Sequence, residues 1–398
     1  MNTEKNKKND WGTSYGELVW KEFTKSRLSV LCFIFIIVLF AIAVLAPFLA
    51  NDKPYFIIID GEPCFPLFRA LKATDYSVFL ASFIGALLLF LTRHNRRRLD
   101  PSLRGSALMR QVIYLAGTLL AGIILIQTLV PYRLDATDYK SMIESGRAES
   151  ALFAPIPYGY ARTDLANREQ PPGPQHWLGT DDVGSDVLCR LIHGSRISLS
   201  VGFVAVGISS VIGIMVGAIL GYFGGKIDFI GMRIVEIVMA IPTFFLIITI
   251  VAFFPRSLFN IMFIIGITSW TGDAQFIRAE FYKLRKQDFV LAARSLGLPL
   301  KSILFRHMLP NGITPVLVNA TFGIAGAIFV EAALSFLGFG VAPPTPSWGQ
   351  MLSLGVSTTG RFLWWLTLFP GMAIFLTVLA YNLVGEAMRD AIDPKLRQ

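Results

Sequence analysis

Charged residues are scarce in this sequence. They make up 16% of its 398 residues, whereas soluble globular chains are roughly 25% charged. Hydrophobic residues account for 54%, and several apolar runs approach or exceed the ~20 residues that a helix needs to cross the hydrocarbon core of a bilayer. The lack of charge therefore excludes an ordinary soluble protein and predicts an all-α polytopic membrane protein.

Residues that hold metals or perform chemistry are also few. The sequence has 4 histidines, scattered over different predicted loops, and 3 cysteines without zinc-ligand spacing. It lacks the P-loop pattern GxxxxGK[ST] and the motifs HExxH and GxSxG. We therefore expect no catalytic residue, no metal site and no cofactor bound by this chain. Cys64 and Cys189 both fall in predicted outer segments, so a disulfide between them stays an open alternative.

The positive charge gathers in a few short segments. A net charge of +9 could indicate nucleic-acid binding. However, lysines and arginines crowd residues 1–27, 93–111 and 278–311, whereas residues 337–361 contain only Arg361. Basic residues in short loops mark the cytoplasmic side of a membrane protein. This asymmetry predicts that both termini are cytoplasmic (N-in, C-in) and that nucleic acid is not a partner.

Eight apolar segments are predicted to span the membrane. They cover residues 28–49, 76–92, 112–131, 197–221, 233–254, 258–277, 312–336 and 363–385. The first is longer than the apolar core of a secretory signal, so we interpret it as an uncleaved span. Around the spans we expect a cytoplasmic N-terminal segment (1–27), an outer loop (50–75) and a long outer segment (132–196).

Glycines spaced four apart mark one face of the predicted span 197–221. They are Gly213, Gly217 and Gly221. Such glycines share a helix face and let another helix approach closely. The spacing leaves two alternatives open, namely packing inside this chain and a moving interface between subunits.

Residues 290–311 form a basic, partly apolar stretch in a predicted cytoplasmic loop, with the sequence VLAARSLGLPLKSILFRHMLPN. Gly297 is placed as the residue that ends a helix. Pro299 suits the first turn of a second helix, and we expect Pro310 to end that helix. The result is a helical hairpin. Spacing alone leaves it either lying on the membrane surface with extended cationic side chains or docking into another protein.

This hairpin resembles the EAA loop of binding-protein-dependent ABC importer permeases. The positions that carry the resemblance are Leu291, Ala292, Ala293, Gly297, Ile303, Leu309 and Pro310. In that family the loop forms a coupling helix that docks in a groove of the ATPase subunit. Leu291 departs from the pattern, because an acidic residue is usual there, and this puts a salt bridge to the ATPase in doubt.

Other segments narrow the resemblance. Residues 176–202, 333–340 and 385–397 are similar to the second, "C"-type membrane subunit of oligopeptide, dipeptide and nickel permeases. Residues 48–54 and 154–159 look like the branch that includes the microcin C and peptide importer permeases.

The resemblance implies a type I ABC importer transmembrane subunit in the cytoplasmic (inner) membrane of a prokaryote. Its permease core would be residues 197–398, and residues 76–131 would be an inserted helical pair added to six core spans. It implies a second homologous permease subunit, two ATPase subunits that bind ATP and Mg, and an extracytoplasmic solute-binding protein. Oligopeptides or modified peptides are the expected cargo. The alternative is a secondary transporter or channel working without an ATPase, which would leave the hairpin unexplained.

Glu331 is an acidic residue inside the predicted span 312–336. An ionisable residue within a membrane is a candidate functional site by default. Two roles stay open for it, a structural hydrogen bond and a contact with substrate in the transport pathway. Asp273 and Glu280 are expected to flank the entrance to the cytoplasmic loop.

Overall fold

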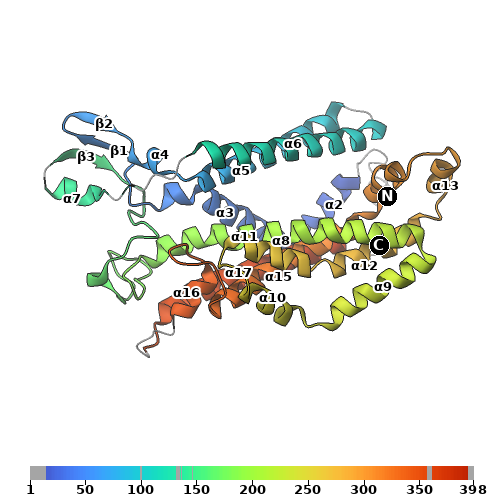
Figure 1. Cartoon of the computed structure of the whole chain (residues 1–398). Helices are drawn as coiled ribbons and strands as arrows, with labels where there is room; N and C mark the ends of the chain where they lie inside the picture. The colour runs from blue at the N-terminus through green and yellow to red at the C-terminus, as the bar shows by residue number, and fades with distance from the viewer. Residues whose placement is uncertain are drawn as a thin grey trace, which may run out of the picture.

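Long apolar helices run side by side in the computed structural model of this protein (Figure 1). The structure describes residues 15–98, 101–130, 135, 137–145, 147–355 and 361–392. Within these ranges, six helices are long and apolar enough to cross a membrane. They are α3 (Arg27–Leu49), α5 (Ala73–Arg98), α6 (Pro101–Leu129), α8 (Val187–Phe223), α15 (Thr314–Phe336) and α17 (Trp364–Ile392). The helical membrane fold is confirmed.

Two of the predicted spans are broken, so the structure has six or seven spans rather than about eight. In place of residues 233–254 it has α9 (Gly225–Ala240) and α10 (Thr243–Ala252), which meet at an angle of 75°. Pro242 lies at this bend, where it has no N–H to continue the helix. In place of residues 258–277 it has α11 (Leu258–Thr268) and α12 (Thr271–Leu284). By itself α11 would rise only about 16 Å, too little for a span.

Shorter elements connect these helices. They are α2 (Tyr15–Phe23), α4 (Pro66–Ala70), α7 (Tyr139–Glu144), α13 (Asp288–Ser295), α14 (Leu309–Gly312), α16 (Trp348–Leu354), η1 (Leu165–Asn167) and the π-helical turn η2 (Ser302–Met308). Phe23 of α2 packs with Val384 and Ala391 of α17. Both described ends of the chain therefore lie at the end of the bundle that carries α13, as predicted for termini on one side (Figure 1).

A small antiparallel sheet lies at the opposite end of the bundle and was not predicted (Figure 1). Its strands are β1 (Phe56–Ile59), β2 (Glu62–Cys64) and β3 (Ala148–Leu152), in the order β2-β1-β3. Ile57 is fully buried and pairs with Cys64 on one side and Ala151 on the other. Such short strands leave little periodicity in the sequence. The sheet joins the segment before the inserted pair to the segment after it.

The two cysteines considered for a disulfide are free thiols. Cys189 is fully buried near the start of α8, where its thiol donates a hydrogen bond to the carbonyl of Tyr158 at 3.0 Å. Cys64 stays partly exposed in β2. The disulfide alternative is therefore not realised in the structure.

The glycine face of α8 packs closely against α12. A Cβ atom at Gly213, Gly217 or Gly221 would lie 2.5 Å from Asp273 Cβ, 2.4 Å from the Ala274 carbonyl oxygen or 2.6 Å from the Arg278 carbonyl oxygen, respectively. Only glycine allows backbones to come this close. Of the two alternatives for these glycines, the structure supports packing within the chain.

We predict that Gly217→Ala destabilises the protein, because the new methyl group would overlap the backbone of α12. Overpacking of this kind costs about 1–3 kcal/mol. Thermal unfolding of the purified protein in detergent should therefore occur at a lower temperature. Gly207→Ala is the matched control, since it lies on the same helix and its Cβ would meet no described atom within 4 Å. Equal unfolding temperatures for the two variants would contradict the packing argument.

Candidate functional site

The cytoplasmic hairpin predicted from residues 290–311 follows directly from α12. After a turn at residues 285–287, α13 ends at Ser295, and Gly297 adopts φ 72°, the left-handed conformation expected of a helix-ending glycine. The predicted end at Pro310 is wrong, because α14 continues to Gly312. Pro310 is the second residue of α14, which follows directly from the π-helical turn η2.

One face of the hairpin is buried against the bundle. Its buried side chains are Val290, Ala293, Ile303, Leu304 and Met308. They form one cluster with Ile277 and Phe281 of α12, Ala218 of α8 and Val316 of α15. Full burial of a large apolar side chain stabilises by about 1.5–3 kcal/mol. The hairpin is therefore firmly attached to α12, and the two can move as one body.

The other face of the hairpin exposes large apolar side chains. These are Phe289, Leu291, Leu296, Leu300 and Phe305, and we call them the hairpin patch. Leu296 is 79% exposed. Exposed lysine and arginine side chains at Arg294, Lys301 and Arg306 accompany them. Grouped exposed apolar residues of this kind mark interaction surfaces.

The seven residues proposed for coupling divide between these two faces. Leu291, Ala292, Gly297 and Pro310 are exposed, whereas Ala293 and Ile303 are buried and Leu309 is partly buried. The exposed four can touch a partner. The buried residues instead hold the hairpin in shape.

Two arginines of the α12 region, which the sequence analysis did not single out, tie α12 to its neighbours. Arg278 forms a bidentate ion pair with Asp228 of α9, with Nη2 donating to Oδ2 at 2.6 Å. Arg285 donates to the carbonyl of Tyr222 at the end of α8 at 3.2 Å. Its guanidinium occupies the space that a side chain at Gly224 would need. These bonds link any movement of the hairpin to α8 and α9.

The segment that begins α8 is held together by a buried polar network. Asp186 accepts from the backbone N–H of Cys189 at 2.7 Å, which caps α8, and its other oxygen lies 2.8 Å from His176 Nδ1. Asp181 forms a buried ion pair with Arg190. The indole of Trp365 on α17 donates to the carbonyl of Thr180 at 3.0 Å. This network anchors residues 178–181 (LGTD), part of the predicted outer segment 132–196, to the bundle.

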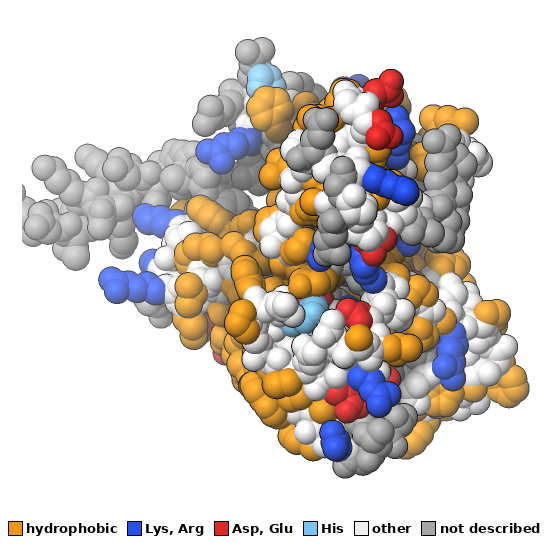
Figure 2. Space-filling model, turned by 90° about the vertical axis from the view of Figure 1, so that its left-hand side faces the viewer, with side chains coloured by type: hydrophobic (Ala, Val, Ile, Leu, Met, Phe, Trp, Pro, Cys, Tyr) orange, Lys and Arg blue, Asp and Glu red, His pale blue; other side chains and the backbone are white. Residues whose placement is uncertain are grey.

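The surface at the sheet end carries side chains of both charges among apolar ones (Figure 2). Lys53 is nearly buried, lies 3.9 Å from carboxylate oxygens of Asp52 and Asp135, and donates to the Thr137 carbonyl. Partial burial raises the pKa of Asp138, but its hydrogen bond and charge interaction with Arg162 outweigh this and hold that pKa below its ordinary value. The ion pair between Asp138 and Arg162 therefore stays formed at neutral pH.

Glu331 lies inside α15 and is fully buried. Its carboxylate accepts hydrogen bonds from the hydroxyl of Ser198 on α8 at 3.1 Å and from that of Ser335 at 2.7 Å. It does not line the cavity described next. The geometry favours the structural alternative for this residue.

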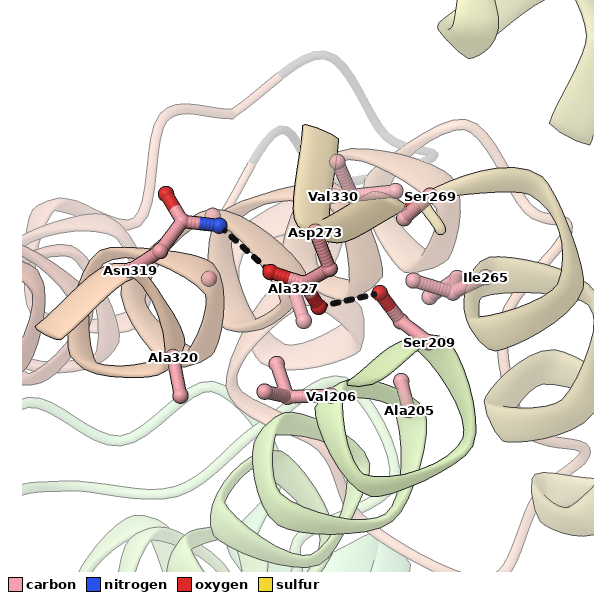
Figure 3. Close-up of a pocket in the computed structure, with 12 residues that line it drawn as sticks. Ala205, Val206, Ser209, Ile265, Ser269, Asp273, Asn319, Ala320, Ala327 and Val330 are labelled. Carbon is pink, nitrogen blue, oxygen red and sulfur yellow. Dashed lines mark hydrogen bonds between the residues drawn. The ribbon is translucent and has the colours of Figure 1, made fainter. Parts of the chain in front are cut away.

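A cavity of about 230 Å³ lies between α8, α11, α12 and α15 (Figure 3). The carboxylate of Asp273 points into it and accepts from Asn319 Nδ2 at 2.7 Å and from the hydroxyls of Ser210 at 2.9 Å and Ser209 at 3.3 Å. Asp273 is only 3% exposed. The sequence analysis placed it at the loop entrance, but α12 begins inside the bundle and takes Asp273 with it. The sequence did contain a signal for this site, because an acidic residue in one predicted span, Asp273, is accompanied by polar residues in other predicted spans.

These features define a multi-pass membrane protein whose hairpin, buried against α12 on one face, exposes on the other face a surface suited to a partner. Comparison with known families then identifies it. Residues 213–398 match the family of binding-protein-dependent transport system inner membrane components. Residues 14–62 match the N-terminal transmembrane domain of oligopeptide transport permease C. The chain belongs to this family of binding-protein-dependent ABC permease subunits.

Individual relatives agree with this assignment. The oligopeptide transport system permease protein OppC of Bacillus subtilis is 40% identical over 250 residues, covering 62% of this chain and 82% of its own length. The dipeptide transport system permease protein DppC of Alkalihalophilus pseudofirmus is 41% identical over 252 residues, covering 62% and 82%. The inner membrane ABC transporter permease protein YejE of Escherichia coli is 31% identical over 378 residues, covering 94% and 96%.

The inserted pair, α5 and α6, lies at the edge of the bundle (Figure 1). The two helices pack on each other, and α5 also contacts α3. Large apolar side chains of the pair, such as Leu89 and Leu120, are exposed. The match to YejE covers nearly all of this chain and therefore includes most of the pair. The region of the pair is thus included in the match to a relative, and the pair lies at the edge of the bundle.

We predict that replacing residues 76–131 by a short glycine-serine linker leaves the rest of the fold intact. The two flanking segments stay together without the pair, because β1 pairs both with β2 before the insertion and with β3 after it. Asp75 is retained because it forms an ion pair with Arg196 at 2.5 Å. Size-exclusion chromatography should show a monodisperse protein that still co-purifies with its partner subunits. Loss of those partners would show that the pair belongs to the assembly interface.

Proposed function

We propose that this chain is one membrane subunit of an importer that carries peptides or modified peptides across the cytoplasmic (inner) membrane of a prokaryote. The names of the OppC and DppC relatives support a peptide cargo. The observation that carries the proposal is the hairpin patch on an element buried against α12. A transporter working without an ATPase has no use for such a surface.

In this proposal, ATP and Mg are bound by two separate ATPase subunits. The sequence of this chain has no P-loop and no catalytic motif. The exposed residues Leu291, Ala292, Gly297 and Pro310 would enter a groove on one ATPase. Small residues at Ala292 and Gly297 permit close approach, and the hairpin patch supplies the apolar contact.

A second, homologous permease would complete the pore, and a solute-binding protein would deliver the cargo from outside. The mixed charges at the sheet end provide a surface of the kind that steers and orients such a partner (Figure 2). This surface includes Asp138 and Arg162, which belong to the predicted outer segment 132–196, and we propose that the solute-binding protein docks there. The transport cycle would be alternating access: closure of the ATPases moves the hairpin, and α12 carries that movement into the bundle.

Co-purification and transport assays test the proposal. The chain, expressed with its chromosomal neighbours, should be isolated in detergent together with a second permease and an ATPase. After reconstitution in liposomes with the binding protein, it should support peptide uptake that requires ATP hydrolysis. Isolation without an ATPase, or uptake driven by an ion gradient alone, would refute the proposal in favour of a secondary transporter.

Leu291→Glu tests the contact at the position where the family pattern has an acid. Leu291 is 45% exposed and belongs to the hairpin patch. We expect an apolar site on the ATPase, where an unpaired carboxylate costs ~1–3 kcal/mol. Substrate-stimulated ATP hydrolysis should therefore fall about tenfold or more. Leu291→Met, which keeps volume and polarity, is the control and should retain stimulation. Unchanged stimulation in Leu291→Glu would mean that the position tolerates either side chain.

A further inference from the structure

Asp273 differs from the other buried aspartates in lacking a cationic partner. Asp181 pairs with Arg190, and Asp228 pairs with Arg278. By contrast, no lysine, arginine or histidine among the described residues forms an ion pair with Asp273. Burying a carboxylate without a counter-charge is costly, so a group that supplies positive charge would be stabilised beside it.

The cavity around Asp273 has room for such a group. Ser209, Ser269 and Asn319 add polar side chains to an otherwise apolar lining (Figure 3). Gly326 also lines the cavity, and a Cβ atom there would meet no described atom within 4 Å. A water molecule takes about 30 Å³ of liquid volume, so about 230 Å³ holds an ammonium group with part of its carbon chain or its hydration shell.

The carboxylate of Asp273 can also accept a hydrogen bond from one more donor. Two carboxylate oxygens offer about four acceptor sites. Three of these are used by Asn319, Ser209 and Ser210. One further donor can therefore bind without displacing any neighbour. A primary ammonium brings three N–H donors and a full positive charge.

We propose that this cavity is a subsite for a protonated amine of the transported substrate, with Asp273 as its charge partner. This inference rests on the proposed function, because it requires that cargo pass between these helices. Glu331, another buried acid of the bundle, does not take this role, since it is fully enclosed and does not line the cavity.

The position of Asp273 also links the subsite to the energy source. Asp273 lies in the first turn of α12, and the hairpin follows the last turn of the same helix, about 16 Å further along. Asn319 belongs to α15, and Ser209 and Ser210 belong to α8. A displacement of α12 by the hairpin would change the distance between the carboxylate and Asn319. The cycle would thereby alter the affinity of the subsite for the amine and release the substrate.

A cysteine placed beside Asp273 measures the charge preference of the cavity without any substrate. Ser269→Cys changes a single atom of a lining residue. Its reaction rates with 2-aminoethyl and 2-sulfonatoethyl methanethiosulfonate, cationic and anionic respectively, are compared in the assembled complex. The ratio of the two rates cancels the effect of Asp273 on ionisation of the thiol itself. The protein with its native cysteines gives the background.

We expect the cation preference to fall about tenfold when Asp273→Asn is added to Ser269→Cys, since the attraction of opposite charges in a partly buried site is lost. Asp273→Glu, which keeps the charge, should preserve the ratio. Glu331→Gln is the matched control, a neutralised buried acid outside the cavity, and should also preserve it. An unchanged ratio in Asp273→Asn would overturn the proposal.

A transport assay provides the second test of the proposal. In liposomes with the complete complex, Asp273→Asn should reduce ATP-dependent uptake of a peptide bearing a free amine at least about tenfold. Asp273→Glu should recover part of that uptake, and Glu331→Gln should transport normally. Wild-type uptake by Asp273→Asn would refute an amine subsite. If the wild-type complex itself imports no peptide, the proposed function fails, whereas the cysteine ratio still decides whether the cavity attracts cations.

Discussion

The contact between α8 and α12 is the constraint on which the rest of this structure depends. Apolar helices gain little from avoiding lipid, so their association in a bilayer relies on close packing and interhelical hydrogen bonds. Gly213, Gly217 and Gly221 bring the backbones together. The bond from Ser210 to Asp273 adds a polar link at one end of the contact, and the bond from Arg285 to Tyr222 adds another beyond it. A side chain on the glycine face would separate all of these partners at once.

Because α12 is held in this way, it connects the cavity to the cytoplasmic hairpin. Its first turn contributes an acid to a cavity between three other helices, and its last turn leads into the hairpin. The hairpin is buried on one side and exposes an apolar patch on the other. A force applied to that patch therefore reaches the cavity through one short, rigid helix. This arrangement fits a permease subunit of the family to which the chain belongs, whose membrane component and energy source are separate proteins.

Local chemistry was a reliable guide where a single residue decides the conformation. Gly297 ends its helix with a positive φ, as predicted. The same reasoning was incomplete at Pro242, where hydropathy suggested one continuous span and the structure bends by 75°. It was wrong at Pro310, where the helical segment continues through the proline to Gly312. A proline thus accompanies a sharp bend at one site and an uninterrupted helical segment at the other, and the residue type alone does not distinguish the two.

The sequence by itself determined the class of protein, the helical fold and the presence of a charged hairpin between spans. These follow from hydropathy, charge asymmetry and helix-ending residues, all of which act over a few neighbouring positions. Only the tertiary structure decided which coupling residues face outward and that Asp273 meets Ser209 and Asn319 inside a cavity. Those partners lie 64 and 46 positions away in the sequence. Their meeting depends on how three helices rotate and pack against one another, which no local pattern encodes.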